Sequence, residues 1–153
     1  SSETVKTAEP VRASTAAAMA EPLFSEGKGP KIAVLDLDGD YGAEFANLLS
    51  DSLKTDLKVN NRKKLAEKNY DTKTITRVSA KKIAAEIAVD YLVTGKINKK
   101  TETLSMISVY LRDSASGDIK LTVSQPLRGE NTAAEASSIV SAKIREQISV
   151  IGR

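Results

Sequence analysis

The sequence contains no cysteine, no histidine and no tryptophan among its 153 residues. Without cysteine and histidine, the chain lacks thiol nucleophiles, serine–histidine–aspartate triads and acid–base catalysis by histidine. The usual structural and catalytic zinc sites are excluded too, because they need ligands of these two types. We therefore predict a protein that is not an enzyme and that carries no cofactor and no resident metal.

Aromatic residues are also scarce, at 4% of the chain, whereas hydrophobic residues make up 41% and charged residues 28%. This composition is typical of a folded domain with an aliphatic core. The length corresponds to one domain with an additional tail. No stretch approaches the roughly 18 consecutive apolar residues that a membrane-spanning helix requires.

The net charge of +3 hides an uneven distribution of charges along the chain. Residues 31–57 carry two lysines and six acidic residues, a local charge of −4, whereas residues 58–82 carry nine basic and two acidic residues, a local charge of +7. The basic segment can bind phosphates or an acidic protein, although a solvated helix face explains such a run equally well. Nucleic acid is not expected as a partner, because only Tyr70 is available for base stacking. The candidate partner-binding residues are Arg62, Lys63, Lys64, Lys68, Arg77, Lys81 and Lys82.

The first thirty residues predict a flexible tether. They are rich in alanine, serine, threonine and glutamate, and Pro10, Pro22 and Pro30 interrupt any long helix. A random coil of this length spans about 30 Å on average. We place the folded domain at residues 31–153.

Residues 31–37 predict a short buried strand that leads into the acidic turn DLDGD. Apolar residues then recur at three-and-four spacing, which predicts a helix at 41–55 with one face packed inward. We expect Asp40 to cap the start of this helix.

The middle of the chain continues with short elements. A brief strand at 57–59 precedes a helix at 62–68, which Asn61 can cap. Ser79 is the next natural cap, and the apolar residues that follow it predict another helix. A strand at 91–97 comes next.

The carboxyl-terminal part predicts a hairpin and a long helix. Apolar and polar residues alternate at 104–112 and 119–123, and turn-forming residues occupy 113–118. Thr132 and Glu135 have capping-box spacing. The helix has an apolar stripe that consists of Ala136, Ile139, Val140, Ile144, Ile148 and Ile151. The charged residues expected to face solvent are Lys143, Arg145 and Glu146.

The order of these elements is strand, helix, strand, two helices, three strands, helix. It predicts an α/β (α+β) fold, with a single mixed sheet of about five strands and three to four helices packed on it.

The segment VLDLDGD suggests an alternative function, because it is similar to the first motif of haloacid dehalogenase phosphatases. In such an enzyme Asp36 would attack phosphorus, Asp38 would act as acid and base, and carboxylates would hold Mg²⁺. However, Asp40 stands where that motif has threonine or valine, and no suitable second motif follows.

The spacing of Asp36, Asp38 and Asp40 also matches the first three ligands of a calcium-binding loop. Tyr41 stands where that loop needs glycine, and Asn47 where it needs glutamate. We favour a simpler interpretation, in which these carboxylates oppose the positive end of the following helix.

Several segments together resemble a superfamily of bacterial envelope lipoproteins that includes the TolB amino-terminal domain, CsgG, FlgO and LpoB. The resemblance covers most of residues 31–119, and its characteristic residues include Arg62, the segment 90–95, Asp113 and Gly117. Val89 departs from the small alanine that is common at its position. The segments are KIAVLDLDGD, GAEFANLLSDSLK, VNNRKKLAE, AAEIAVDYLVTGKI and ISVYLRDSASGDI.

The resemblance implies a non-enzymatic module in the periplasm of a Gram-negative bacterium. Such a module binds another envelope protein or assembly, in secretion, flagellar function or peptidoglycan synthesis, or assembles with copies of itself. The resemblance also implies attachment to the outer membrane through a lipidated cysteine, which would precede Ser1. The connections between the predicted elements are too short for the membrane hairpins of a pore.

Overall fold

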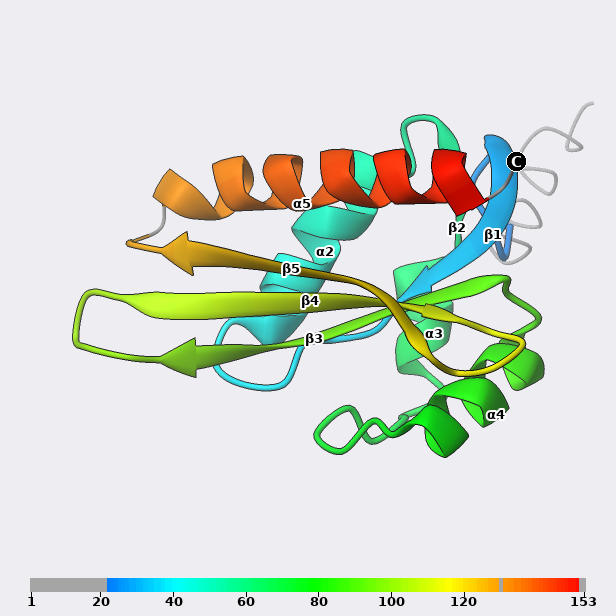
Figure 1. The fold of residues 1–153 in the computed structure, drawn as a ribbon, viewed down its shortest axis with the longest axis horizontal. Coiled ribbons are helices and arrows are strands. Elements are labelled where there is room, and N and C mark those ends of the chain that lie inside the picture. The colour runs from blue at the N-terminus through cyan, green and yellow to red at the C-terminus, as the bar shows by residue number, and fades with distance from the viewer. Residues whose placement is uncertain (1–21, 130, 152–153) are drawn as a thin grey trace, which may run out of the picture.

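The computed structural model describes residues 22–129 and 131–151. In these residues the apolar patterns of the sequence form five strands and four helices (Figure 1). The strands make one mixed sheet in the order β2-β1-β3-β4-β5, so the predicted fold class is confirmed. The part of the predicted tether at residues 1–21 lies outside the described residues. The elements are β1 (Lys28–Val34), α2 (Gly42–Leu53), β2 (Leu57–Val59), α3 (Arg62–Ala66), α4 (Arg77–Ile87), β3 (Tyr91–Lys99), β4 (Ser105–Asp113), β5 (Ile119–Leu127) and α5 (Asn131–Ile151).

The sheet combines a parallel half and an antiparallel half. Strand β1 lies between β2 and β3 and runs parallel to both, whereas β3, β4 and β5 form an antiparallel meander. The register places apolar residues opposite one another, as in the pairs Val93–Leu111 and Val109–Val123. Partners in such pairs share one face of the sheet, so the two-residue alternation creates an apolar face.

The larger core lies between this face and the helices α2 and α5. It contains twenty of the described residues, and Phe45, Leu49 and Ile144 within it are fully buried. The predicted stripe on α5 is confirmed for Ala136, Val140, Ile144 and Ile148, whereas Ile139 and Ile151 are only half-buried.

The smaller core lies on the opposite face, under α3 and α4. It contains nine of the described residues, among which Leu65 comes from α3 and Ile83 and Ile87 come from α4. Figure 1 shows α4 and α5 on opposite sides of the sheet. The two faces therefore differ in how much apolar area they bury.

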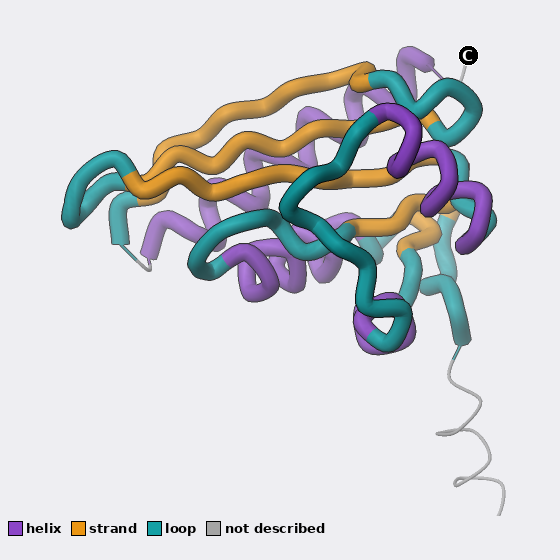
Figure 2. The backbone as a smooth tube through the Cα atoms, turned by 90° about the horizontal axis from the view of Figure 1, so that it is seen from below, coloured by secondary structure: helices purple, strands orange, loops and turns teal. Residues whose placement is uncertain are grey.

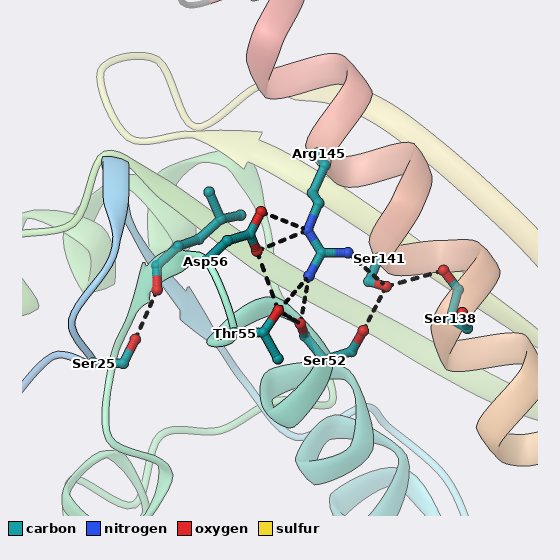
Figure 3. A network of polar contacts seen from close by, with 8 residues as sticks. Ser25, Ser52, Thr55, Asp56, Ser138, Ser141 and Arg145 are labelled. Atoms are coloured by element: carbon teal, nitrogen blue, oxygen red, sulfur yellow. Dashed lines mark hydrogen bonds and ion pairs between the residues drawn. The ribbon is translucent and has the colours of Figure 1, made fainter.

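A polar network joins α5 to the end of α2 (Figure 3). The Arg145 guanidinium donates to the Asp56 carboxylate at 2.9 Å and to the backbone oxygen of Ser52. The hydroxyls of Ser52 and Ser141 lie 2.8 Å apart. The prediction that Arg145 faces solvent was wrong, because the α2–β2 turn supplies acceptors that the local helical pattern does not reveal.

Residues ahead of the predicted domain start at Lys31 also take part in the fold. Residues 23–25, which we call the edge strap, lie along the outer side of β2: the Ser25 amide donates to Val59 O at 2.9 Å, and Asn61 donates to Leu23 O at 2.8 Å. Strand β1 then begins at Lys28. Pro30 is tolerated because the register between β1 and β2 shifts there, so its missing N–H breaks no regular ladder bond.

The start of α2 also differs from the prediction. Tyr41, rather than Asp40, occupies the cap position, in the left-handed region with φ of 69° and without a capping side chain. The next position, Gly42, requires glycine because a Cβ atom there would lie 1.8 Å from Leu37 O. A Cβ atom on Gly39 would lie 2.4 Å from Ile97 O. Close packing of the acidic turn, rather than side-chain capping, fixes where this helix begins.

Capping of α3 was predicted correctly, but capping of α4 was not. Asn61 accepts hydrogen bonds from the amides of Lys63 and Lys64. Thr76 caps α4, and Ser79 completes a capping box from the third helical position, with the Ser79 amide donating to Thr76 Oγ1 at 3.1 Å. Thr76 and Ser79 both carry hydroxyls near the start of α4. The sequence predicted Ser79 as the cap, whereas the structure has Thr76 in that position.

The start of α5 also differs from the capping-box prediction. The helix begins at Asn131, so Thr132 is already inside it. The Thr132 hydroxyl accepts from the Arg128 amide at 2.8 Å and donates to Gly129 O at 3.0 Å. It therefore ties the helix to the end of β5, which extends four residues beyond the predicted strand.

Candidate docking surface

Helices α3 and α4, together with the turn that follows α3, carry six of the seven predicted basic residues on what we call the α3–α4 surface. The apolar residues of α4 pack on the sheet, which turns the basic residues of this helix outward. Lys64 is half-buried, and the other five are exposed: Lys63, Lys68, Arg77, Lys81 and Lys82. Most of the predicted set is therefore exposed to solvent on the segments that cover the smaller core.

In the part of the chain that the structure describes, the lysines of the α3–α4 surface form no close ion pair with the neighbouring carboxylates, which include Glu67 and Glu86. Within residues 22–129 and 131–151, no ion pair involves Lys63, Lys64, Lys68, Lys81 or Lys82. Arg77 makes only a long contact, of 3.9 Å, with Asp118. Positive charge that has no internal partner remains available to attract an acidic partner.

An exposed apolar residue lies among these charges. Val78 on α4 is 71% exposed, and Lys81 and Lys82 lie three and four residues further along the helix, on the same side. Apolar side chains within a charged surface are typical of contact sites. Sequence reasoning missed Val78, although its position outside the apolar stripe could have revealed it.

A groove runs between α3 and the carboxyl-terminal end of α4. It encloses about 350 Å³, and residues from three segments line it, including Leu23, Lys64, Lys68 and Glu86. Asn60 also lines the groove, and its buried amide nitrogen and oxygen have no hydrogen-bond partner in the described part of the chain. The groove thus combines apolar, basic, acidic and amide groups, with two glutamates, Glu67 and Glu86, beside the two lysines.

Tyr70 connects the two helices next to this groove. Its hydroxyl donates to Glu86 Oε1 at 2.6 Å, and its ring packs against the smaller core. Burial, together with the adjacent Glu86 carboxylate, raises the pKa of Tyr70 to about 12. The phenol therefore stays neutral and donates this bond throughout the physiological range.

Arg62 differs from the other predicted residues, because its side chain is only 16% exposed. The guanidinium donates to Val34 O at 2.8 Å and to Asn47 Oδ1 at 2.9 Å, and it forms an ion pair with Asp36. These contacts join α3 to β1 and α2. Arg62 therefore stabilises the domain, and little of its charge faces a partner.

The acidic turn does not form a metal-binding group. The Asp36 carboxylate is engaged by Arg62, while the Asp38 backbone extends the sheet by donating to Gly95 O at 3.0 Å. Across the described residues, no cluster of three or more histidine, cysteine, aspartate or glutamate side chains is placed to hold a metal ion. This geometry does not favour the alternative phosphatase function, which needs a free nucleophilic carboxylate at Asp36.

Among the helices that the structure describes, none combines the length and the apolar character needed to cross a membrane.

Comparison with solved structures confirms the predicted resemblance at the level of the fold. TolB from Acinetobacter baumannii superimposes with a TM-score of 0.55 at 21% identity, over 82% of this chain and 29% of the TolB chain. The lipoprotein GNA1162 from Neisseria meningitidis gives a TM-score of 0.53 at 16% identity, over 76% of this chain and 94% of that one. A PelC variant from Paraburkholderia phytofirmans, solved as a dodecamer, gives 0.52 at 13% identity, over 76% and 89% of the two chains.

No protein-family model matches the sequence, and no curated protein matches it. The fold is therefore shared with TolB, PelC and the lipoprotein GNA1162.

Proposed function

We propose that this chain, which shares its fold with envelope lipoproteins, is a non-enzymatic interaction module of the Gram-negative cell envelope. It acts in the periplasm, held at the outer membrane by a lipidated tether ahead of the folded domain. The module binds another envelope protein or assembly through the α3–α4 surface. The observation that carries this proposal is the group of five lysines without carboxylate partners in the described part of the chain, next to the exposed Val78.

The chemistry of this surface favours an acidic protein partner. Unpaired lysines accelerate encounter with an oppositely charged surface and select against basic partners. Val78 supplies an apolar contact that excludes water, which long-range charge attraction alone does not provide. The partner should therefore present carboxylates around a small apolar patch.

Charge reversal tests the surface directly. A variant with glutamate at Lys63, Lys64, Lys81 and Lys82 should lose partners that the wild type recovers from envelope extracts. The matched control reverses four exposed lysines outside α3 and α4: Lys99, Lys100, Lys120 and Lys143. Both variants change the charge equally, so only a difference between them supports the α3–α4 surface. Equal recovery by the two variants would remove this surface from the proposal.

Self-assembly is the second candidate function, because the PelC variant with the same fold was solved as a dodecamer. The chain mass is 16.4 kDa, so light scattering distinguishes a monomer from a ring without ambiguity. A ring that persists in the charge-reversal variant would assign assembly to another surface. Lipid attachment is tested separately, by metabolic labelling of the natural gene product with a radioactive fatty acid.

A further inference from the structure

A polar cleft lies on the α4 side of the sheet, distinct from the α3–α4 surface. Thr94 and Lys96 from β3, together with Tyr110 and Arg112 from β4, form its floor. The connection between α3 and α4 supplies one wall with Thr72, Lys73 and Ile75. Figure 2 shows this connection on the same side of the strands as α4. The cleft encloses about 320 Å³, the size of a small-molecule site.

Topology explains why the cleft exists at this position. Strand β1 ends here and the chain turns away to α2, whereas the parallel strand β3 continues and returns through β4. Ligands in α/β proteins commonly bind where the connections of neighbouring parallel strands diverge. In addition, Thr94 pairs with Tyr110, and Lys96 pairs with Ser108, so polar side chains follow the open part of this face.

The charges that line the cleft are mainly positive. Lys73, Lys96 and Arg112 contribute three cations, whereas Asp38 contributes the single carboxylate of the lining. In the described residues, no ion pair involves Lys73, Lys96 or Arg112. The local excess of positive charge therefore favours an anion.

Arg112 is the most constrained of these cations. Its guanidinium donates to Gly117 O at 2.8 Å and to Ile75 O at 3.4 Å, while its buried Nε atom has no partner in the described chain. Burial lowers the pKa of Arg112, although a guanidinium still remains charged near neutral pH. The protein thus holds a partly desolvated positive charge against two neutral carbonyls, with Asp118 near it but not in an ion pair, and an anion in the cleft would compensate that charge directly.

Thr94 supplies an independent observation. It is only 3% exposed, and its hydroxyl has no hydrogen-bond partner among the described residues. A buried hydroxyl without a partner destabilises the fold, whereas valine would fill the same volume without this cost. The hydroxyl is therefore better explained as a donor to a group that enters the cleft.

We propose that this cleft binds a small oxyanion, a phosphate or carboxylate group, that is held by Lys73, Lys96 and Arg112 and accepts a hydrogen bond from Thr94. Tyr110, Ile75 and Ile119 provide the less polar part of the lining and contact the remainder of the ligand. The site does not depend on the proposed docking function, since it uses none of the α3–α4 residues.

Nuclear magnetic resonance titration of the full chain tests the site, with inorganic phosphate and acetate as probes at constant ionic strength. We expect saturable shifts of the Thr94, Gly95 and Lys96 amides with at least one probe. Stronger binding of phosphate assigns the site to phosphate groups, and stronger binding of acetate assigns it to carboxylates. Shifts that grow linearly with both anions, without saturation, would overturn the proposal.

Variants distinguish a built site from general attraction of anions. Substitutions Lys73→Gln and Thr94→Val should each weaken binding about tenfold, whereas Thr94→Ser should retain it. The control pair Lys81→Gln and Lys82→Gln removes two positive charges outside the cleft and should leave binding unchanged. If the control weakens binding as much as Lys73→Gln does, attraction is not specific to the cleft and the assignment is wrong. A thermal melt of each variant checks that the fold is intact.

Discussion

The two faces of the sheet differ in how completely helices cover them. Helices α2 and α5, of 12 and 21 residues, close one face over the larger core. Helices α3 and α4, of 5 and 11 residues, cover only part of the other face and leave the cleft open beside them. Because a larger buried apolar area contributes more stability, we expect the face under α2 and α5 to contribute more to the free energy of unfolding than the face under α3 and α4.

Matched leucine truncations test this comparison with the largest expected effects. Leu49 in the larger core is 0% exposed, and Leu65 in the smaller core is 4% exposed. We expect Leu49→Ala to lower the free energy of unfolding by about 4 kcal/mol and Leu65→Ala by about 2 kcal/mol, because Leu65 lies on a short helix that can shift to fill the space. Urea denaturation measures both values. Equal losses would mean that the two cores contribute alike.

An arginine on each face provides a second matched pair. Arg62 is 16% exposed and Arg145 is 30% exposed, and each links its helix to backbone oxygens and to one aspartate. We expect Arg62→Met to cost about 2 kcal/mol, because it leaves the buried Val34 carbonyl and Asp36 without their donor. Arg145→Met should cost about 1 kcal/mol, since solvent screens its partners more effectively. If Arg145→Met loses more unfolding free energy than Arg62→Met, the partly covered face depends less on buried polar contacts than the other face does.

Capping of α4 gives a smaller effect, confined to the partly covered face. Thr76→Ala removes the cap itself and should lower the free energy of unfolding by about 1 kcal/mol. Ser79→Ala removes the hydrogen bond from the Thr76 amide to the Ser79 hydroxyl. This change should lower the free energy of unfolding by less than half of that amount. Thermal melts of the two variants, compared with the wild type, measure the difference. The reverse order would restore Ser79 as the principal cap.

The alkaline titration of Tyr70 provides a pH-dependent test of the partly covered face. Its pKa is raised above the usual value of 10.0, so the neutral phenol is favoured in the folded state. The stability that it contributes is complete below pH 10 and is lost as the pH rises from 10 through about 12. Compared with Tyr70→Phe, the wild type should therefore lose unfolding free energy in this window. Urea midpoints of both proteins, measured across the window, provide the test, and parallel curves would contradict it.

Periodicity predicted most of the fold, because alternation and helical spacing depend on neighbouring residues. The stripe on α5 that includes Val140 and Ile144 could be found in this way, as could the alternation of β4. The positions of helix caps were less predictable. Several residues beside each helix can accept or donate a capping bond, and the backbone path decides which of them does.

The candidate sites, too, could be predicted only where neighbouring residues define them. The basic residues of α3 and α4 could be predicted as a set, since their charges lie outside the apolar stripes. Arg62 could not be separated from that set, because its acceptors on Val34 and Asn47 come from distant parts of the sequence. The cleft depends on the pairing of Thr94 with Tyr110, which no local pattern defines.

The edge strap also determines how the domain responds to mechanical force. Any pull applied ahead of Pro22 reaches residues 23–25 before it reaches the sheet. The backbone bonds of Ser25 with Val59 and of Asn61 with Leu23 can then open one after another, whereas β3, β4 and β5 are strands of nine residues that pair along most of their length. A domain loaded from this end should therefore lengthen by peeling off its first few residues, so that the groove beside α3 would lose Leu23 while the cleft on β3 and β4 would keep its lining.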